Sequence, residues 1–375
     1  MKSGMVASRN SVRWQQAASR KGTRTLSIIA TSLDDLKQKL IWSREALQGD
    51  AATQVQDVRG IYYTEKPLSQ DGKVAFLFSG QGSQYPDMLR SLATHFSEVR
   101  EQFELADRAL LDRFPLRLSS YIFPPPRFNH EEEAASQNAL TRTDIAQPAL
   151  GAASMGLFQL LRSLGVSPDL VAGHSYGEYA ALCSAGVFDE EALYKLSEAR
   201  GRCIIEAAGQ QDLGTMAAVM ETAERVSSIL ESIEEVWVAN INAPRQTVIS
   251  GTRRGIERAT ELLVQREINV RAIPVACAFH SPIISEARDR LAAILSLSKF
   301  NAPRLKVFSN TSAEAYPDQP ASVVALLAEH LVNPVRFADE VSANLALKSW
   351  LLPMEIEGLD LTKQFMLLHV SSLRS

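Results

Sequence analysis

The sequence has few of the residues that build disulfide frameworks or metal clusters. Its 375 residues include three cysteines, Cys183, Cys203 and Cys277, which lie far apart within apolar stretches. An odd number of scattered thiols fits neither a disulfide framework nor a zinc cluster, and we interpret them as small core residues. Free thiols are typical of a reducing compartment. We therefore expect a cytoplasmic protein without a structural metal.

Long apolar runs and an excess of one charge are also missing. No apolar stretch reaches the roughly 20 residues of a transmembrane helix. The net charge is −4 and the pI is about 6.0, which gives no general attraction to nucleic acid. We expect neither a membrane nor nucleic acid as a partner. The hydrophobic content of 46% is sufficient for a large core, and the length favours two domains.

The first 24 residues contain six Lys or Arg residues and no acidic residue. A Ser- and Arg-rich segment without acids is typical of an organelle transit peptide, and a linker is the alternative. We favour the linker because the segment runs without a break into structured sequence. A strand over Leu26 to Ala30, a helix over Leu33 to Leu47 and a strand over Val58 to Tyr63 are predicted there.

The stretch Leu170 to Phe188, LVAGHSYGEYAALCSAGVF, carries the clearest catalytic pattern. It reads as a short apolar strand, a turn over Gly173 to Gly177, and a helix from Glu178. This is the G-x-S-x-G nucleophile elbow, with Ser175 at its centre. The helix N-terminus would direct its positive end at charge developing on a substrate. The alternative is a buried strand–turn–helix with an incidental serine.

A second glycine-containing turn follows the apolar strand Lys73 to Phe78, which reads as buried on both faces. The turn, SGQGSQ, is not G-x-G-x-x-G and lacks the Lys-Ser/Thr of a P-loop, which disfavours nucleotide binding. Gln81 and Gln84 would lie at the carboxyl edge of the sheet, where open α/β folds bind their ligands. A plain turn is the alternative.

From Thr215 to Val275 the predicted order is strand, helix, strand, strand, helix, strand. This is the split βαβ, ferredoxin-like arrangement. Its two ends would lie close together, as an insertion into a larger fold requires. The predicted strands and helices, in order, are Met216–Met220, Glu221–Ile233, Val236–Ile241, Gln246–Ser250, Gly255–Arg266 and Asn269–Val275.

A serine nucleophile needs a base for its proton and donors for the oxyanion. His280 is the best candidate for the base, because it follows an apolar stretch leading out of a strand and precedes a helix over Ile283 to Leu295. A structural histidine is the alternative. His174, beside Ser175 on a tight turn, is predicted to be structural.

Six motifs in this order resemble the acyltransferase family of fatty-acid and polyketide synthases, the malonyl-CoA:acyl-carrier-protein transacylases. The resemblance covers roughly residues 73 to 340. The motifs are Gly80-Gln81-Gly82-Ser83-Gln84, Gln147-Pro148-Ala149-Leu150, Gly173-His174-Ser175-Tyr176-Gly177-Glu178, Arg200-Gly201-Arg202, Ala278-Phe279-His280-Ser281 and Asn333-Pro334-Val335.

The resemblance implies an α/β fold of two subdomains. The large subdomain, α/β-hydrolase-like, would comprise residues 73–212 and 277–344. The inserted ferredoxin-like subdomain (βαββαβ) would comprise residues 213–276. Residues 1–72 resemble the small α/β linker between ketosynthase and acyltransferase in type I synthases.

For catalysis, the resemblance implies that Ser175 is the acyl-accepting nucleophile and His280 the general base and then the general acid. Gln81 and Tyr176 would supply the backbone N–H groups of the oxyanion hole. Asn310 would supply a carbonyl that orients His280.

For the substrate, the resemblance implies that Arg200 binds the free carboxylate of a malonyl-type group through its planar fork. Phe279 resembles the malonyl-selective pattern, because a bulky ring narrows the space for a 2-methyl group. The expected acyl donor is malonyl-CoA, a coenzyme A thioester, with no bound cofactor. The expected acceptor is the phosphopantetheine thiol of an acyl carrier protein, with ketosynthase and other synthase domains as further partners.

Two departures from the family pattern stand out. Ser79 replaces the usual proline before Gly80, and no closing strand is recognisable after Asn344. We therefore expect residues 345–375 to be a divergent tail, and a missing strand would leave a sheet edge exposed. The alternatives to a malonyl-type acyltransferase are a serine lipase or esterase using the same elbow, and an inactive truncated synthase fragment.

Overall fold

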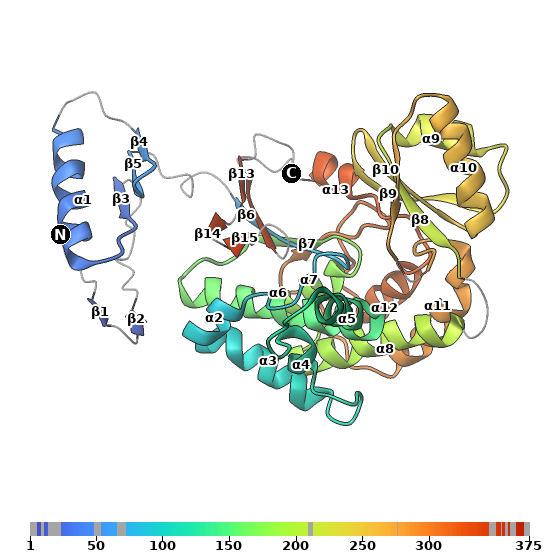
Figure 1. Cartoon of the computed structure of the whole chain (residues 1–375), viewed down its shortest axis with the longest axis horizontal. Helices are drawn as coiled ribbons and strands as arrows, with labels where there is room; N and C mark the ends of the chain where they lie inside the picture. Colours follow the sequence, from blue (N-terminus) through green and yellow to red (C-terminus); the bar gives the residue numbers. More distant parts are fainter. Residues whose placement is uncertain are drawn as a thin grey trace. The chain divides into compact units, whose positions relative to one another are not determined.

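The computed structural model describes residues 6–8, 11–13, 24–48, 54–65, 73–208, 213–275, 277–344, 350–353, 355–356, 359–360 and 365–370. The chain divides into two compact units, Met1–Lys73 and Val74–Ser375 (Figure 1). Most of the N-terminal 24 residues, and with them the choice between transit peptide and linker, lie outside the described residues. Six of those that are described form a short antiparallel pair of strands, β1 (Val6–Ser8) and β2 (Ser11–Arg13).

The first unit contains an antiparallel sheet in the order β3-β5-β4 and one helix, α1 (Leu33–Ala46). Ser32 caps this helix, because its side chain accepts a hydrogen bond from the backbone N–H of Asp35. The predicted helix is therefore confirmed. The strands are β3 (Thr25–Ile28), β4 (Gln54–Asp57) and β5 (Ile61–Thr64).

The second unit is built on a five-stranded sheet in the order β12-β7-β6-β16-β13. The strands β12 (Lys306–Val307), β7 (Leu170–Gly173) and β6 (Lys73–Phe78) pair in parallel. Residues 75–78 of β6 and all of β7 are buried, as expected of a sheet covered on both faces. The carboxyl ends of β6 and β7 thus bring the two glycine turns of the sequence to one edge.

Our expectation that the missing closing strand leaves a sheet edge exposed is wrong, because the other side of β6 is paired. β16 (Phe365–Val370) lies beside β6, and β13 (Trp350–Pro353) pairs antiparallel with β16. A short hairpin, β14 (Glu355–Ile356) and β15 (Leu359–Asp360), lies between them in sequence. The sequence did not reveal these strands, because short apolar runs without glycine turns have no distinct period and pairing to β6 is a long-range contact.

Helices surround this sheet and form the main core. The longest is α6 (Thr143–Ser163), which packs against α3 (Ser97–Ala109) and α8 (Glu190–Ala208). Eighteen of its residues are buried, which makes α6 the central helix of this core. The others are α2 (Arg90–His95), α4 (Leu118–Ile122), α5 (His130–Thr141), α7 (Gly177–Ser184), α11 (Ser285–Ser296), α12 (Pro320–Glu329) and α13 (Phe337–Asn344). No helix in the described part of the chain is long and apolar enough to cross a membrane.

A second, antiparallel sheet has the order β11-β8-β10-β9 and a small core of its own. The predicted succession of strands and helices between residues 215 and 275 is confirmed. Its elements are β8 (Thr215–Val219), α9 (Ala223–Leu230), β9 (Val236–Ala243), β10 (Gln246–Gly251), α10 (Arg253–Gln265) and β11 (Val270–Ile273).

The turn between β7 and α7 has no room for side chains at its glycines. A Cβ on Gly173 would lie 2.0 Å from the carbonyl carbon of Gly177, and a Cβ on Gly177 would lie 2.1 Å from the carbonyl oxygen of Phe78. These neighbours are backbone atoms held in the sheet and the helix, so they cannot move aside. The spacing of the two glycines is thus a steric requirement of this turn.

We expect Gly173→Ala to destabilise the protein by several kcal/mol or to prevent folding, because backbone must shift to admit the methyl group. Gly82→Ala is the control: its Cβ would meet nothing within 4 Å, although φ is +109° there, so its cost should be limited to about 1–3 kcal/mol of backbone strain. Urea denaturation measures both. Equal losses of stability would contradict the close packing of the elbow.

Candidate active site

Ser175 lies at the tip of the turn between β7 and α7 in a left-handed backbone conformation, with φ of +51°. A non-glycine residue in this region carries strain of roughly 1–3 kcal/mol, which the surrounding structure has to offset. The N–H of His174 donates to the carbonyl of Phe78 at 2.9 Å and so ties the turn to β6. The strained turn directs Ser175 Oγ into a cavity.

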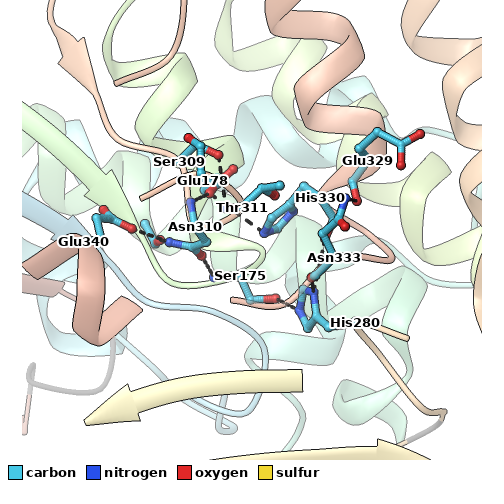
Figure 2. Close-up of polar contacts among 12 residues, drawn as sticks. Ser175, Glu178, His280, Ser309, Asn310, Thr311, Glu329, His330, Asn333 and Glu340 are labelled. Carbon is cyan, nitrogen blue, oxygen red and sulfur yellow. Dashed lines mark hydrogen bonds and ion pairs between the residues drawn. The ribbon is translucent and has the colours of Figure 1, made fainter. Parts of the chain in front are cut away.

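The structure brings His280 to this serine, as Figure 2 shows. His280 Nε2 lies 2.7 Å from Ser175 Oγ, and Nδ1 lies 3.1 Å from the carbonyl oxygens of both His330 and Asn333. Because Nδ1 faces two acceptors, it carries the ring proton, and Nε2 is left to accept from the serine hydroxyl. Backbone carbonyls therefore orient the base, in the place where a Ser-His-Asp triad has a carboxylate.

Burial, together with the nearby Arg200 and His174, lowers the pKa of His280 to about 3. His280 as a whole is 3% exposed. The imidazole is therefore neutral at neutral pH, which is the form that can take the proton of Ser175.

Asn310 does not have the predicted role of orienting His280. Its main-chain carbonyl accepts from the N–H of Arg336 at 2.9 Å, and its side-chain Oδ1 accepts from the N–H of Ser175 at 2.7 Å. The carbonyls that do orient the base follow α12, where the last carbonyls of a helix lack partners within the helix. A carbonyl belongs to every residue type, so the sequence could not identify which ones contact His280.

Gln81 and Tyr176, the predicted oxyanion donors, flank the serine from β6 and from the start of α7. Within the described residues, neither backbone N–H donates to a protein acceptor. The Gln81 side chain is held by the Nε2 of Gln147 at 3.1 Å and by Thr143 Oγ1 at 3.3 Å. The buried Tyr176 ring stacks on Tyr179, so its side chain is structural and only its N–H is available.

Ser175 lines a cavity of about 330 Å³, to which residues of both sheets contribute. From the large sheet and its helices come Gln81, Ser175 and Arg200. From the antiparallel sheet and the segment after it come Met216, Asn240, Val248, Ile273, Phe279 and His280. Phe279 is 7% exposed, and its ring lies beside the imidazole of His280. The described residues contain no group of His, Cys, Asp or Glu positioned to hold a metal ion.

Arg200, on α8, is the cation of this cavity and is 1% exposed. Its Nε and Nη2 are buried without a hydrogen-bond partner among the described residues. Burial lowers its pKa, but a guanidinium remains charged at any physiological pH. A buried cation with unmet donors is costly in the free protein. An anion in the cavity would satisfy it.

Sequence reasoning missed several residues behind the elbow. Glu178 and Glu340 are buried carboxyls, and the ring of His330 packs edge-on against that of His280 with centroids 5.3 Å apart. Glu178 was visible only as the last residue of the elbow motif. Glu340 and His330 lie in amphipathic helical sequence with no motif of their own, so only their packing reveals them.

An elbow serine paired with a neutral imidazole, facing a cavity, is the arrangement of enzymes that form acyl-serine esters. The sequence matches the acyl transferase domain family over residues 75–349. The chain belongs to this family of malonyl-CoA:acyl-carrier-protein transacylase-type acyltransferases.

Similar proteins include stand-alone enzymes and parts of large synthases. The chain is 36% identical to the malonyl CoA-acyl carrier protein transacylase of Bacillus subtilis over 73% of its own length and 83% of that protein. It is 35% identical to one component of the polyunsaturated fatty acid synthase of Thraustochytrium over 75% of its length, but spans only 10% of that protein.

Two solved structures share the fold. The malonyl CoA-acyl carrier protein transacylase of Coxiella burnetii has a TM-score of 0.65 at 32% identity, with 72% of this chain and 82% of that chain covered. An acyltransferase domain of the salinomycin polyketide synthase has a TM-score of 0.71 at 31% identity, with 86% and 70% covered.

Because the pKa of His280 is lowered, we expect the rate of acylation of Ser175 to be independent of pH on the acid side of neutrality. With p-nitrophenyl acetate, an uncharged donor, kcat/KM for acylation should stay level from pH 7 to about pH 5, whereas a base of ordinary pKa would lose about 25-fold. His95→Gln, which removes an exposed histidine, should leave the profile unchanged. A decline with its midpoint near the ordinary histidine pKa would contradict the buried, neutral base.

Proposed function

We propose that this chain transfers a malonyl-type acyl group from coenzyme A, through an ester on Ser175, to the phosphopantetheine thiol of an acyl carrier protein. The observation that supports this proposal most directly is the position of Arg200. Arg200 lines the cavity that also holds the 2.7 Å contact between Ser175 and His280, and its Nε and Nη2 have no hydrogen-bond partner among the described residues. A site for an anion beside a nucleophile fits an acyl group that has a free carboxylate.

In the first half-reaction, His280 Nε2 takes the proton as Ser175 Oγ attacks the thioester carbonyl. The N–H groups of Gln81 and Tyr176 stabilise the oxyanion, and each such donor typically contributes about 10²–10³ in rate. The carbon–sulfur bond then breaks, and coenzyme A leaves as the thiol with the proton from His280. The carbonyls of His330 and Asn333 stabilise the imidazolium, since both face Nδ1.

The second half-reaction reverses these steps with a different thiol. His280 takes the proton of the phosphopantetheine thiol, the sulfur attacks the ester carbonyl, and Ser175 regains its proton. The apolar walls of the cavity and the neutral carbonyl partners of Nδ1 support transfer to a bound thiol over hydrolysis by water. A solved complex of a carrier protein with its malonyl-transacylase, with a TM-score of 0.64 at 31% identity, supports the choice of acceptor.

Phe279 supports selection of an unsubstituted malonyl group. Its ring lines the cavity beside His280, where a 2-methyl substituent would need room. One side chain in an apolar pocket typically discriminates a methylene by about 1–3 kcal/mol.

The finer description of the fold is also our proposal: a large α/β-hydrolase-like subdomain with a ferredoxin-like insertion at residues 213–276. Within that insertion the sheet order is β11-β8-β10-β9, the fourth, first, third and second of its strands. All neighbours are antiparallel and two helices lie between them in sequence, as expected of the split βαβ arrangement. We further propose a linker role for residues 1–72, work beside ketosynthase and other synthase domains, and a cytoplasmic location.

Acylation of Ser175 is the direct test. Incubation with malonyl-CoA should add one malonyl group to the intact protein, mapped by mass spectrometry to the Ser175 peptide. Ser175→Ala should show no adduct and His280→Ala a strongly slowed one. A folded wild-type protein that gains no adduct would refute the proposal and favour an inactive fragment. Rapid release of free malonate without transfer to carrier protein would favour a hydrolase.

The role of Arg200 is tested by comparing two donors. Arg200→Ala should lower kcat/KM for malonyl-CoA by about 100-fold or more, because it leaves the substrate carboxylate buried and unpaired. Acetyl-CoA, which lacks that carboxylate, should react as well as before or better. Arg202→Ala is the matched control on the same helix: Arg202 pairs with Glu198 at 2.9 Å and is part-exposed. A preserved malonyl preference in Arg200→Ala would exclude this role.

A further inference from the structure

Asn310 is buried, and each of its polar atoms takes part in a hydrogen bond. It follows β12, and its side-chain Oδ1 accepts from the N–H of Ser175 at 2.7 Å. Its Nδ2 donates to the carbonyl of Gly173 at 2.8 Å and to Oε2 of Glu340 at 2.6 Å. Its backbone N–H donates to the carboxyl of Glu178 (Figure 2). Its carbonyl accepts from the backbone N–H of Arg336 at 2.9 Å.

The side-chain amide therefore clamps the elbow on both sides of its tip. One end holds the residue before the turn, Gly173, and the other holds the nucleophile itself. Between them the chain passes through the strained φ of Ser175. Strained backbone persists where surrounding contacts over-determine it. Two hydrogen bonds from one planar group, acting across three residues, constrain the direction of the Ser175 Cα–Cβ bond.

The clamp works in only one orientation of the amide. If the amide were flipped, its oxygen would face the Gly173 carbonyl and the Glu340 carboxyl, while its NH₂ would face the Ser175 N–H. Glu340, on α13, accepts the second N–H of Nδ2 and so adds to the preference for this orientation that Gly173 and Ser175 give. Burial raises the pKa of Glu340 to about 8, and its carboxyl oxygen remains an acceptor when the group is neutral.

The clamp also determines which donors remain for chemistry. Because the Ser175 N–H is bonded to Asn310, it does not point into the cavity. The N–H of Tyr176, the next along the chain, stays without a protein acceptor among the described residues. Asn310 thus separates the donor that holds the elbow from the donor that can face an oxyanion.

We propose that Asn310 is a positioning residue for the nucleophile and that Glu340 reinforces the orientation of its amide. The proposal rests on the proposed function only in taking Ser175 as the nucleophile. It assigns neither residue a contact with substrate. Misplacement of a reacting group by about 1 Å can cost on the order of 100-fold in rate.

The test measures the reactivity of Ser175 with an alkyl fluorophosphonate, which forms an Oγ–phosphorus bond, releases fluoride and needs no acyl-binding pocket. Asn310→Ala should react about 10- to 100-fold more slowly than wild type. Glu340→Ala should slow the reaction about 10-fold. Glu340→Gln can still accept from Asn310 Nδ2, so it should retain at least a third of the wild-type rate. In malonyl loading, the losses should appear in the acylation rate constant with KM changed by less than about threefold.

A matched control separates positioning from general destabilisation. Leu110→Ala removes a buried core side chain outside the site and should lower the melting temperature while leaving the labelling rate unchanged. Labelling of Asn310→Ala at the wild-type rate would overturn the proposal, as would rate losses that merely follow melting temperature across all variants. Should Asn310→Ala not fold, equal rates in Glu340→Gln and Glu340→Ala would overturn it. Wild-type protein that labels with the fluorophosphonate but not with malonyl-CoA would count against the proposed function alone.

Discussion

Close approach of three backbone segments is the constraint on which the active site depends. The end of β6, the end of β7 and the start of α7 meet so tightly that Gly173 and Gly177 have no space for a Cβ. This contact forces the intervening turn to be short and places Ser175 in a left-handed conformation. The serine is consequently exposed to the cavity at a fixed position, and every other group of the site is placed relative to it.

The site concentrates charge and polarity where the protein is otherwise apolar. Arg200, Glu178, Glu340, His280 and His330 are all buried around the elbow. Burial lowers the pKa of both histidines and raises the pKa of both carboxyls to about 8, so that these four groups favour their neutral forms near neutral pH. Arg200 alone stays charged, because a guanidinium does not release its proton. The Tyr179 ring, 5.7 Å from the guanidinium carbon, is one partner of this charge, and an anion in the cavity would offset more of the free energy of burying it.

The antiparallel sheet positions residues of the site in addition to lining its cavity. Its strand β9 continues its pairing into the segment after α12, where Val335 exchanges backbone hydrogen bonds of 2.8 Å with Ala239 and Ile241. That segment includes Asn333, whose carbonyl faces His280 Nδ1. The base itself follows β11, so the antiparallel sheet and its connections position the histidine while the parallel sheet positions the serine. The 2.7 Å contact between Ser175 and His280 therefore depends on the relative position of the two sheets.

Local sterics and residue chemistry were determined by the sequence alone. The spacing of glycines around Ser175, the apolar strands before each turn and the residue types at His280 and Arg200 can be read without coordinates, because each depends on a side chain or its absence. Tertiary structure decided the rest. The carbonyls that orient His280, the clamp from Asn310 to the elbow, and the pairing of β16 beside β6 all join segments far apart in the chain. Some of these contacts use backbone groups, which every residue has. Others use short apolar runs without a period, so no residue pattern predicts them.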